Sequence, residues 1–336
     1  MGRPRAGRGA VRAAAVKVLV TGASGMLGAA TADALAARGD TVTVLQRRPS
    51  GRGHREVLAD VADARAVRAA VEGQDAVVHL AAKVDVTGPW RAYRRTNVAG
   101  TRAVLSACRA TGVSRLVHVS SPSVAHTGAA LVGAPAGPAE PDRVRGHYAR
   151  SKALAERIVL EPGPAGPAVL VVRPHLVWGP GDTQLVGRIV ERARRGRLFV
   201  VGSGAALIDT TYVSNAADAL VAALDRCADA HGHALVVSNG EPRPIGELFA
   251  AICRAVGVAP PRRAVPTGLA RVAGAVAEAT WATVPPLRRR GDPPLTRFLA
   301  EQLSTAHWFD QRTTREVLGW APRVGLDAAL ATLGRQ

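Results

Sequence analysis

Tyr148 and Lys152 are the residues of this chain whose types and spacing most directly indicate chemistry. The chain has only three tyrosines and three lysines, and one of each stands four positions apart. This spacing places both side chains on one face of a helix. A phenol has a reference pKa of about 10, and a nearby ammonium favours its ionised form. The pair predicts a proton relay beside a reacting oxygen, although a solvated surface pair would have the same spacing.

A second hydrogen-bond donor is expected near the phenol, because hydride addition to a carbonyl carbon leaves negative charge on oxygen. Ser120 and Ser121 end the apolar run 115–119, and Pro122 prevents this run from continuing as an interior strand. Reacting groups on a parallel sheet lie at the carboxyl ends of its strands. One of these serines is therefore predicted to orient the substrate carbonyl, with an ordinary turn as the other interpretation.

Three glycines follow the apolar run 16–20 directly. In a strand, turn and helix setting, Gly22 permits a tight turn, Gly25 lets backbone amides approach a pyrophosphate, and Gly28 lets the helix pack against the sheet. The helix N-terminus then binds the phosphates. A plain turn between strand and helix is the alternative. The predicted dinucleotide contacts of this turn are Gly22, Ser24, Gly25, Met26, Leu27 and Gly28.

The end of the second predicted strand normally carries a carboxylate that binds the ribose 2′-hydroxyl of NAD. Here the strand ends in Gln46, Arg47 and Arg48, so no acidic residue repels a 2′-phosphate and two guanidinium groups are available to bind it. NADP(H) is the predicted cofactor, and NAD(H) stays open because arginine is abundant throughout the chain. Asp60 is expected to accept a hydrogen bond from the adenine or to cap the next helix. The two further cofactor contacts predicted here are Asp60 and Val61.

Short apolar runs alternate with helix-compatible segments over the first half of the chain. This alternation predicts an α/β fold with a doubly wound parallel sheet. Beyond Pro174 the rhythm is lost and proline and glycine increase, so a smaller mixed lobe is expected there. The predicted organisation is a disordered basic arm at 1–15, a dinucleotide-binding domain at 16–174 and a substrate lobe at 175–336, some of whose segments return to the sheet. The expected strands are 16–20, 41–45, 75–80, 115–119 and 168–172.

Together, the glycine turn, Ser121 and the Tyr148 and Lys152 pair resemble the extended short-chain dehydrogenase/reductase family, over nearly the whole chain. Within it, the chain is most similar to the 3β-hydroxysteroid dehydrogenase group, which includes bacterial relatives that reduce 2-alkyl-3-oxoalkanoic acids in olefin and β-lactone biosynthesis. The segments that carry the likeness are His79–Ala82, Thr96–Thr101, Val119–Val124, Arg173–Asp182, Asp209–Ala219, Leu295–Arg297 and Trp308–Asp310.

The resemblance implies a role for each matched residue. Tyr148 would be the acid and base, and Lys152 would bind the nicotinamide ribose and lower the pKa of the phenol. Ser121, which matches by its position three residues before Val124, would orient the substrate carbonyl. Asn97 would hold the active-site helix and a water. The cofactor contacts expected from the same segments are Leu80, Ala81, Ala82, Lys83 and Pro174.

The resulting functional prediction is an NAD(P)-dependent oxidoreductase that interconverts a 3-keto and a 3-hydroxy group on a hydrophobic substrate. Reduction of a 2-alkyl-3-oxoalkanoic acid is the leading reaction. The alternatives are a 3β-hydroxysteroid or sterol dehydrogenase with or without isomerisation or decarboxylation, a nucleotide-sugar epimerase or dehydratase, and a non-catalytic NAD(P)-sensing protein. The intact Tyr148 and Lys152 argue against a sensor. A homodimer is expected from the resemblance alone.

Composition excludes several other classes. The 336-residue chain is 47% apolar and carries a formal charge of +18, but all except three of its 44 basic residues are arginines spread along the sequence. We attribute this charge to a codon bias and expect no nucleic-acid partner. Three widely spaced cysteines form neither a disulfide framework nor a metal site. A reducing, cytoplasmic location and no metal are therefore expected.

The segment 268–281 has an apolar spacing compatible with one helical face, formed by Leu269, Val272, Val276 and Trp281. This face could line an acyl tunnel, or rest on a membrane surface with the arginines at 288–290 on the headgroups, or pack against the sheet. His175 has no partner at metal-ligand spacing and is interpreted as a pocket wall or a hydrogen-bonded core residue. No run of the sequence is long and apolar enough to predict a spanning helix.

Overall fold

A parallel sheet of seven strands forms the larger part of the molecule in this computed structural model, which describes residues 15–85, 88–161, 166–284 and 295–335. The spatial order is β12-β7-β5-β4-β1-β2-β3. The direction of strand succession reverses between β1 and β4, which makes their carboxyl ends the topological switch point. The strands are β1 (Lys17–Thr21), β2 (Thr41–Gln46), β3 (Arg55–Leu58), β4 (Ala76–His79), β5 (Arg115–Val119), β7 (Ala168–Pro174) and β12 (Ala234–Val237).

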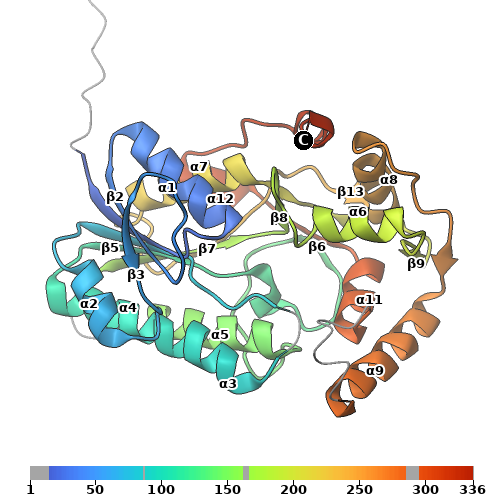
Figure 1. The fold of residues 1–336 in the computed structure, drawn as a ribbon, viewed down its shortest axis with the longest axis horizontal. Helices are drawn as coiled ribbons and strands as arrows, with labels where there is room; N and C mark the ends of the chain where they lie inside the picture. Colours follow the sequence, from blue (N-terminus) through green and yellow to red (C-terminus); the bar gives the residue numbers. More distant parts are fainter. Residues whose placement is uncertain (1–14, 86–87, 162–165, 285–294, 336) are drawn as a thin grey trace, which may run out of the picture.

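Helices cover both faces of this sheet (Figure 1). Successive side chains of a strand point to opposite faces, so Val18 and Val20 of β1 join one apolar core whereas Leu19 joins the other. One face carries α1 (Met26–Arg38), α7 (Val213–Asp225) and α12 (Arg312–Leu318). The other carries α2 (Ala64–Val71), α4 (Gly100–Thr111) and α5 (His147–Leu160), with α3 (Trp90–Tyr93) and the π-helical turn η1 (Arg94–Ala99) leading into α4.

The predicted fold class is confirmed, and each of the five predicted strands is present to within one or two residues at either end. Two strands of this seven-stranded sheet, β3 and β12, were not predicted. The edge strand β3 is largely polar, and its Leu58 is 54% exposed. The other edge strand, β12, is a run of only four residues. It pairs with β7 but follows it in the part of the sequence where the regular alternation of strands and helices has ended. Both edges lack the long apolar pattern that marks an interior strand.

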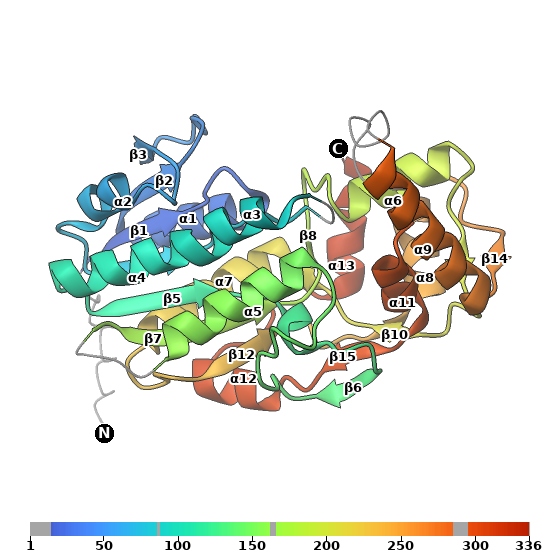
Figure 2. The same cartoon turned by 90° about the horizontal axis from the view of Figure 1, so that it is seen from below.

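The second lobe lies beside the carboxyl ends of the parallel strands (Figure 2). Its mixed sheet has the order β13-β10-β15-β6, with β10 antiparallel to β13 and parallel to β15. The strands are β6 (Leu131–Ala134), β10 (Leu207–Ile208), β13 (Arg243–Pro244) and β15 (His307–Phe309), and the two small pairs are β8 (Val177–Trp178) with β11 (Thr211–Tyr212) and β9 (Val200–Val201) with β14 (Ala264–Val265). The helices are α6 (Val186–Arg194), α8 (Ile245–Ala255), α9 (Thr267–Thr283), α11 (Arg297–Ser304) and α13 (Leu326–Ala331).

The segment at 268–281 forms α9, which packs on α11 rather than on the parallel sheet. A Cβ atom at Gly274 would lie 2.6 Å from the backbone of Arg297, so the glycine permits the close approach of the two helices. Leu269, Val272 and Val276 are 59–63% exposed on α9. They do not line the cavity described below, so the acyl-tunnel interpretation of this face was wrong.

Two expectations lie outside the described residues: the disordered arm, apart from Ala15, and the arginines at 288–290. Among the helices of the described ranges, none combines the length and apolar character needed to cross a membrane.

Candidate active site

One cavity of about 730 Å³ runs along the carboxyl ends of the parallel strands and into the second lobe. At one end it is lined by the glycine turn after β1 and by the ends of β2 and β4, and in the middle by Ser121, Tyr148 and Lys152. The far end is mainly apolar. Its lining there includes Leu176, Leu185, Ile189, Leu198, Phe199, Ile208, Ile245, Leu248, Phe249, Leu295 and Leu299.

The glycine turn is shaped by close backbone contacts. Gly22 has a φ of +79°, and a Cβ atom there would lie 2.8 Å from the backbone of Ala81. A Cβ atom at Gly28 would lie 2.3 Å from the carbonyl oxygen of Gly22, whereas one at Gly25 would meet nothing closer than 3.5 Å. The helix α1 begins at Met26 without a side-chain cap, so its first amides have no side-chain acceptor. These residues fit the pyrophosphate of a dinucleotide.

Tyr148 lies in the first turn of α5, which follows Gly146 with its φ of +85°. Burial raises the pKa of the phenol, and hydrogen bonding with Ser121 lowers it by a smaller amount. Lys152, which was expected to lower this pKa, is not among the groups that shift it, and desolvation is the largest effect. The consequence is a protonated phenol at neutral pH, which is the form needed to donate a proton to a ketone.

Lys152 is 3% exposed, and its ammonium donates to the backbone carbonyl of Val119 over 2.6 Å. Burial lowers the pKa of Lys152 to about 8, while the carboxylate of Glu156 one turn further along α5 acts in the opposite direction. Glu156 is itself buried and paired with Arg173 at the end of β7. A buried lysine is thus retained at the centre of the cavity at a cost in desolvation.

Two buried histidines behind Lys152 are neutral. Burial, with a smaller contribution from Lys152, lowers the pKa of His79 to about 3 and also lowers that of His118 well below its usual value. The ring of His79 bridges Thr21 and Thr101 through hydrogen bonds of 2.8 and 3.0 Å. His79 therefore ties β1, β4 and α4 together and adds no charge beside the ammonium.

The two adjacent serines have different environments. The Ser121 hydroxyl faces the cavity, accepts from the Ser123 amide at 3.3 Å and lies 3.0 Å from the Ser123 hydroxyl. It thereby caps the short helix η2 (Pro122–Ala125). Ser120 also reaches the cavity, but its hydroxyl is buried without a partner among the described residues. Of the two serines, Ser121 is the one whose side chain lowers the pKa of the Tyr148 phenol.

Asn97 lies within the π-helical turn η1 and is 1% exposed. Its amide nitrogen donates to Ser151 at 2.8 Å and to the carbonyl of Lys83 at 3.1 Å, while its amide oxygen accepts from the Lys83 amide at 2.7 Å. Asn97 therefore fastens α5 to the segment that follows β4. It does not line the cavity.

The structure brings most of the predicted cofactor contacts to one wall of the cavity and leaves three outside it. Met26, Arg48 and Lys83 are not part of the lining, and Lys83 pairs with Asp85. Asp60 pairs with Arg95 at 2.8 Å, and Asp63, not Asp60, caps α2. The predicted contacts that line the cavity are Gly22, Ser24, Gly25, Leu27, Gly28, Arg47, Asp60, Val61, Leu80, Ala81, Ala82, Tyr148, Lys152 and Pro174.

A carboxylate does lie near the end of β2, which the sequence did not lead us to expect. Glu56 of β3 accepts hydrogen bonds from Gln46 at 2.9 Å and from the amide and hydroxyl of Ser50 at 2.9 and 2.6 Å. These contacts lower the pKa of Glu56. The pairing of β3 with β2 places Glu56 beside the end of β2, so the residues that directly follow β2 in the sequence gave no signal for it.

Three cavity arginines were not assigned from the sequence, whereas His175 was expected to be a pocket wall or a hydrogen-bonded core residue. Arg188, Arg192 and Arg197 line the second-lobe end, and nothing in their spacing distinguished them from the other arginines. His175 lines the middle of the cavity and is bonded to the buried Asp209. Within the described ranges, no cluster of His, Cys, Asp and Glu has the geometry to hold a metal ion.

Similarity to known proteins assigns the chain to a family. The NAD dependent epimerase/dehydratase family matches residues 18–238, and the chain belongs to this family. A 2-alkyl-3-oxoalkanoate reductase of Stenotrophomonas maltophilia is 43% identical over 328 residues, covering 95% of this chain and 98% of that protein. One from Shewanella oneidensis is 35% identical, covering 96% and 88%.

A solved structure has a similar fold. MoeE5 in complex with UDP-glucose and NAD superposes with a TM-score of 0.69 and 27% identity, covering 95% of this chain and 97% of that one. With the relatives named above, these findings confirm the predicted membership of the extended short-chain dehydrogenase/reductases and an NAD(P)-dependent oxidoreductase as the class of enzyme.

Proposed function

We propose that this protein is an NADPH-dependent ketoreductase that reduces the 3-keto group of a 2-alkyl-3-oxoalkanoic acid to the hydroxyl. The observation that carries the proposal is a single cavity that joins the glycine turn, the Ser121, Tyr148 and Lys152 group and a long apolar wall. The relatives named 2-alkyl-3-oxoalkanoate reductase support the substrate class, since they match this chain over nearly its whole length. An apolar wall suits the alkyl chains of such an acid.

The chemistry divides between the cofactor and the side chains. When bound, the nicotinamide supplies a hydride to the carbonyl carbon. Tyr148 donates the proton that the carbonyl oxygen gains, so a ketone, a hydride and a proton give one secondary alcohol. Ser121 donates a hydrogen bond to the same oxygen and stabilises the negative charge that develops there. Burial keeps the phenol protonated until this step.

Lys152 acts on the cofactor side of the phenol. At neutral pH its ammonium is mainly protonated, since the lowered pKa of about 8 is still above 7. It would hold the ribose hydroxyls next to the nicotinamide and replenish the proton on Tyr148. The bond from Nζ to the carbonyl of Val119 fixes its position at the end of β5.

The preference for NADPH over NADH rests on Arg47. This guanidinium lines the cavity beside Gln46 at the end of β2, where a 2′-phosphate would lie. Glu56 approaches the same region, but its carboxylate accepts from Gln46 and Ser50 and does not line the cavity. Arg47 would therefore meet the 2′-phosphate. Asp60 lines the same end of the cavity but is paired with Arg95.

The substrate class is tested by incubating the enzyme and NADPH with a 2-alkyl-3-oxoalkanoic acid, a 3-ketosteroid and UDP-glucose. Consumption of NADPH with the acid, and a 3-hydroxy acid as product, is the expected result. Turnover confined to the steroid would contradict the proposal and favour a sterol dehydrogenase. Conversion of UDP-glucose to its epimer in a parallel incubation with NAD⁺, without net formation of NADH, would favour an epimerase.

A further inference from the structure

The end of β7 places His175 next to the catalytic group. β5 and β7 pair in parallel through Val119 and Val172, and the amide of Ser120 continues this ladder to the carbonyl of Val172 at 2.7 Å. Neighbouring strands lie about 4.8 Å apart. Ser121 and His175 therefore leave the sheet on adjacent strands, and both line the same cavity.

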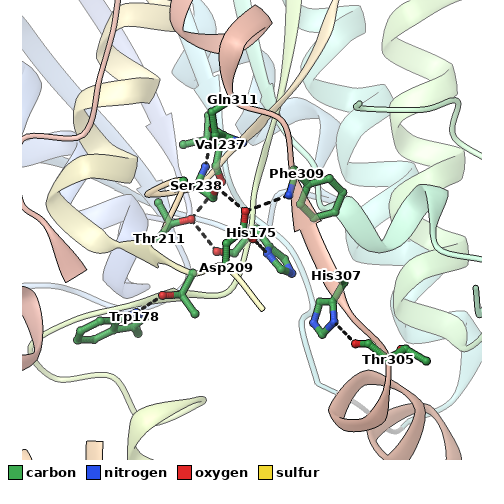
Figure 3. Close-up of polar contacts among 12 residues, drawn as sticks. His175, Trp178, Asp209, Thr211, Val237, Ser238, Thr305, His307, Phe309 and Gln311 are labelled. Atoms are coloured by element: carbon green, nitrogen blue, oxygen red, sulfur yellow. Dashed lines mark hydrogen bonds and ion pairs between the residues drawn. The ribbon is translucent and has the colours of Figure 1, made fainter. Parts of the chain in front are cut away.

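The backbone and ring of His175 are held from several sides (Figure 3). Its amide donates to Val237 at 2.9 Å, and its carbonyl accepts from the Thr211 hydroxyl at 2.6 Å. Its ring meets those of His307 and Phe309 edge-on, with centroids 5.1 and 5.0 Å apart. The following residue, Leu176, has a φ of +43°, a strained conformation of the kind that functional sites retain.

Asp209 determines which nitrogen of the ring is available. This carboxylate is fully buried and accepts from Nδ1 of His175, from the hydroxyl of Ser238 at 2.7 Å and from the amide of Phe309 at 3.1 Å (Figure 3). Because a carboxylate only accepts, Nδ1 carries a proton. Across the described part of the chain, Nε2 of His175 makes no hydrogen bond, and it is the nitrogen left for a ligand.

The two neighbouring histidines differ from His175 in their ring contacts. His307 donates through Nδ1 to the carbonyl of Thr305 at 2.9 Å, and burial lowers its pKa to about 3. Burial also lowers the pKa of His126, whose ring lies 6.5 Å from that of His307. Both rings are therefore neutral at physiological pH, and among the described residues neither ring is hydrogen-bonded to a carboxylate as that of His175 is.

We propose that Nε2 of His175 donates a hydrogen bond to the carboxylate of the 3-oxo acid and so makes the enzyme select acids over neutral ketones. This inference rests on the proposed function. In such an acid a single carbon separates the ketone from the carboxyl group, so binding the ketone at Ser121 and Tyr148 brings the carboxylate to the adjacent strand end. The ring of His175 would then lie between two carboxylates, that of Asp209 on Nδ1 and that of the substrate on Nε2.

Arg188, Arg192 and Arg197 are the competing cationic groups of the cavity. They belong to α6 and the segment after it, in the second lobe, whereas His175 directly follows the strand beside Ser121. The arginines are therefore assigned no contact with a carboxyl group two bonds from the ketone carbon. The test below includes them.

The experiment compares a 2-alkyl-3-hydroxyalkanoic acid with its methyl ester as substrates for oxidation by NADP⁺, since hydroxy acids are chemically stable. H175N retains a donor at the Nδ1 position for Asp209 and removes Nε2. H307N is the matched control. It retains a donor to the carbonyl of Thr305 and removes Nε2 of the neutral ring next to His175. We expect H175N to lower kcat/KM for the acid about 10- to 100-fold, mainly through KM, with less than about a threefold change for the ester. H307N should retain the preference for the acid.

Equal losses for acid and ester in H175N would overturn the proposal, as would an unchanged acid preference. Loss of the preference in R192Q with its retention in H175N would assign the carboxylate to the arginines. If thermal melting shows that H175N does not fold, H175A, which also lacks a donor in the place of Nε2, replaces it under the same criteria. A wild-type enzyme that oxidises neither compound refutes the proposed function itself, and this outcome is distinct because it precedes any variant.

Discussion

At the scale of the residue, the site is built from groups that burial makes costly. Lys152 is nearly inaccessible, and its neighbour on α5, Glu156, is committed to Arg173. Desolvation of a charge destabilises a folded protein unless partners compensate for it. The shift in the pKa of Lys152 from 10.5 to about 8 corresponds to about 3 kcal/mol that the fold tolerates for the sake of its function.

This burial predicts a pH-dependent stability. Below about pH 8 the lysine is protonated in both the folded and the unfolded state. The destabilisation caused by burying its ammonium is then fully present. Between about pH 8 and pH 10.5 the folded state releases its proton first, so the free energy of unfolding rises with pH. Denaturant titrations at several pH values should show this rise, up to about 3 kcal/mol, in the wild type relative to Lys152→Met.

K152M serves as the control because it removes the titrating group and leaves Glu156 paired with Arg173. It should be at least as stable as the wild type at neutral pH while losing activity. Parallel pH profiles of unfolding for the two proteins would contradict the assignment of a buried ammonium.

The reactive residues themselves were predictable, but their electrostatics were not. The spacing of Tyr148 and Lys152 identified the pair, since four residues are one helical turn. The direction of the shift in the pKa of Tyr148 depends on desolvation, which comes from elements distant in the sequence. His175 was noted as a pocket wall or a bonded core residue, and the structure shows both properties together because Asp209, 34 positions away, is its partner.

At the scale of the element, the turn between β1 and α1 combines two different demands on glycine. Gly28 is required by packing, because any Cβ there meets the backbone of Gly22 at 2.3 Å. Gly25 has ordinary space for a Cβ on the protein side and is placed where a pyrophosphate would approach. The two positions therefore separate folding from cofactor binding.

Gly28→Ala should lower the free energy of unfolding by about 1–3 kcal/mol, because the backbone of the turn must move. The Tm of Gly25→Ala should lie within about 1 °C of that of the wild type, since the change in its free energy of unfolding is near zero. The same variant should bind NADPH about tenfold more weakly, a loss of about 1.4 kcal/mol in binding free energy. Thermal melts and fluorescence titrations of NADPH measure both effects. A G28A protein as stable as the wild type would show that the turn has more freedom than the structure gives it.

The interior strands were predictable because two covered faces require continuous apolar runs, as in β1. The edge strands β3 and β12 were not, since one is polar and the other short. The unpredicted strand β3 also affects the candidate active site. Glu56 lies beside Gln46 only through the pairing of β3 with β2, so the absence of an acid after β2 in the sequence described only part of that environment.

At the scale of the whole molecule, the cavity lies where the parallel sheet meets the second lobe. The second lobe has short strands drawn from distant parts of the chain, such as β6 beside β15 and β15 beside β10. Pairings of this kind leave little local periodicity, which is why the sequence predicted a mixed lobe without its order. A cofactor that binds across the switch point contacts several of these elements and should stabilise them together.

Ligand stabilisation provides a test of cofactor choice. A ligand at 100 times its Kd stabilises the folded state by about 2.7 kcal/mol, which raises Tm by several degrees. NADPH should therefore raise Tm more than NADH at equal concentration. Arg47→Ala should remove most of this difference, whereas Arg48→Ala, whose side chain lies outside the cavity lining, should retain it. A larger shift with NADH in the wild type would contradict the preference for NADPH.

In the proposed reaction, a protonated Tyr148 phenol delivers the proton to a ketone beside the bound cofactor. The most direct measurement is the rate of NADPH oxidation with a 2-alkyl-3-oxoalkanoic acid by the wild type and by Tyr148→Phe. We predict a kcat at least about 100-fold lower in Y148F, with the stabilisation by NADPH retained. Undiminished turnover by Y148F would contradict the account.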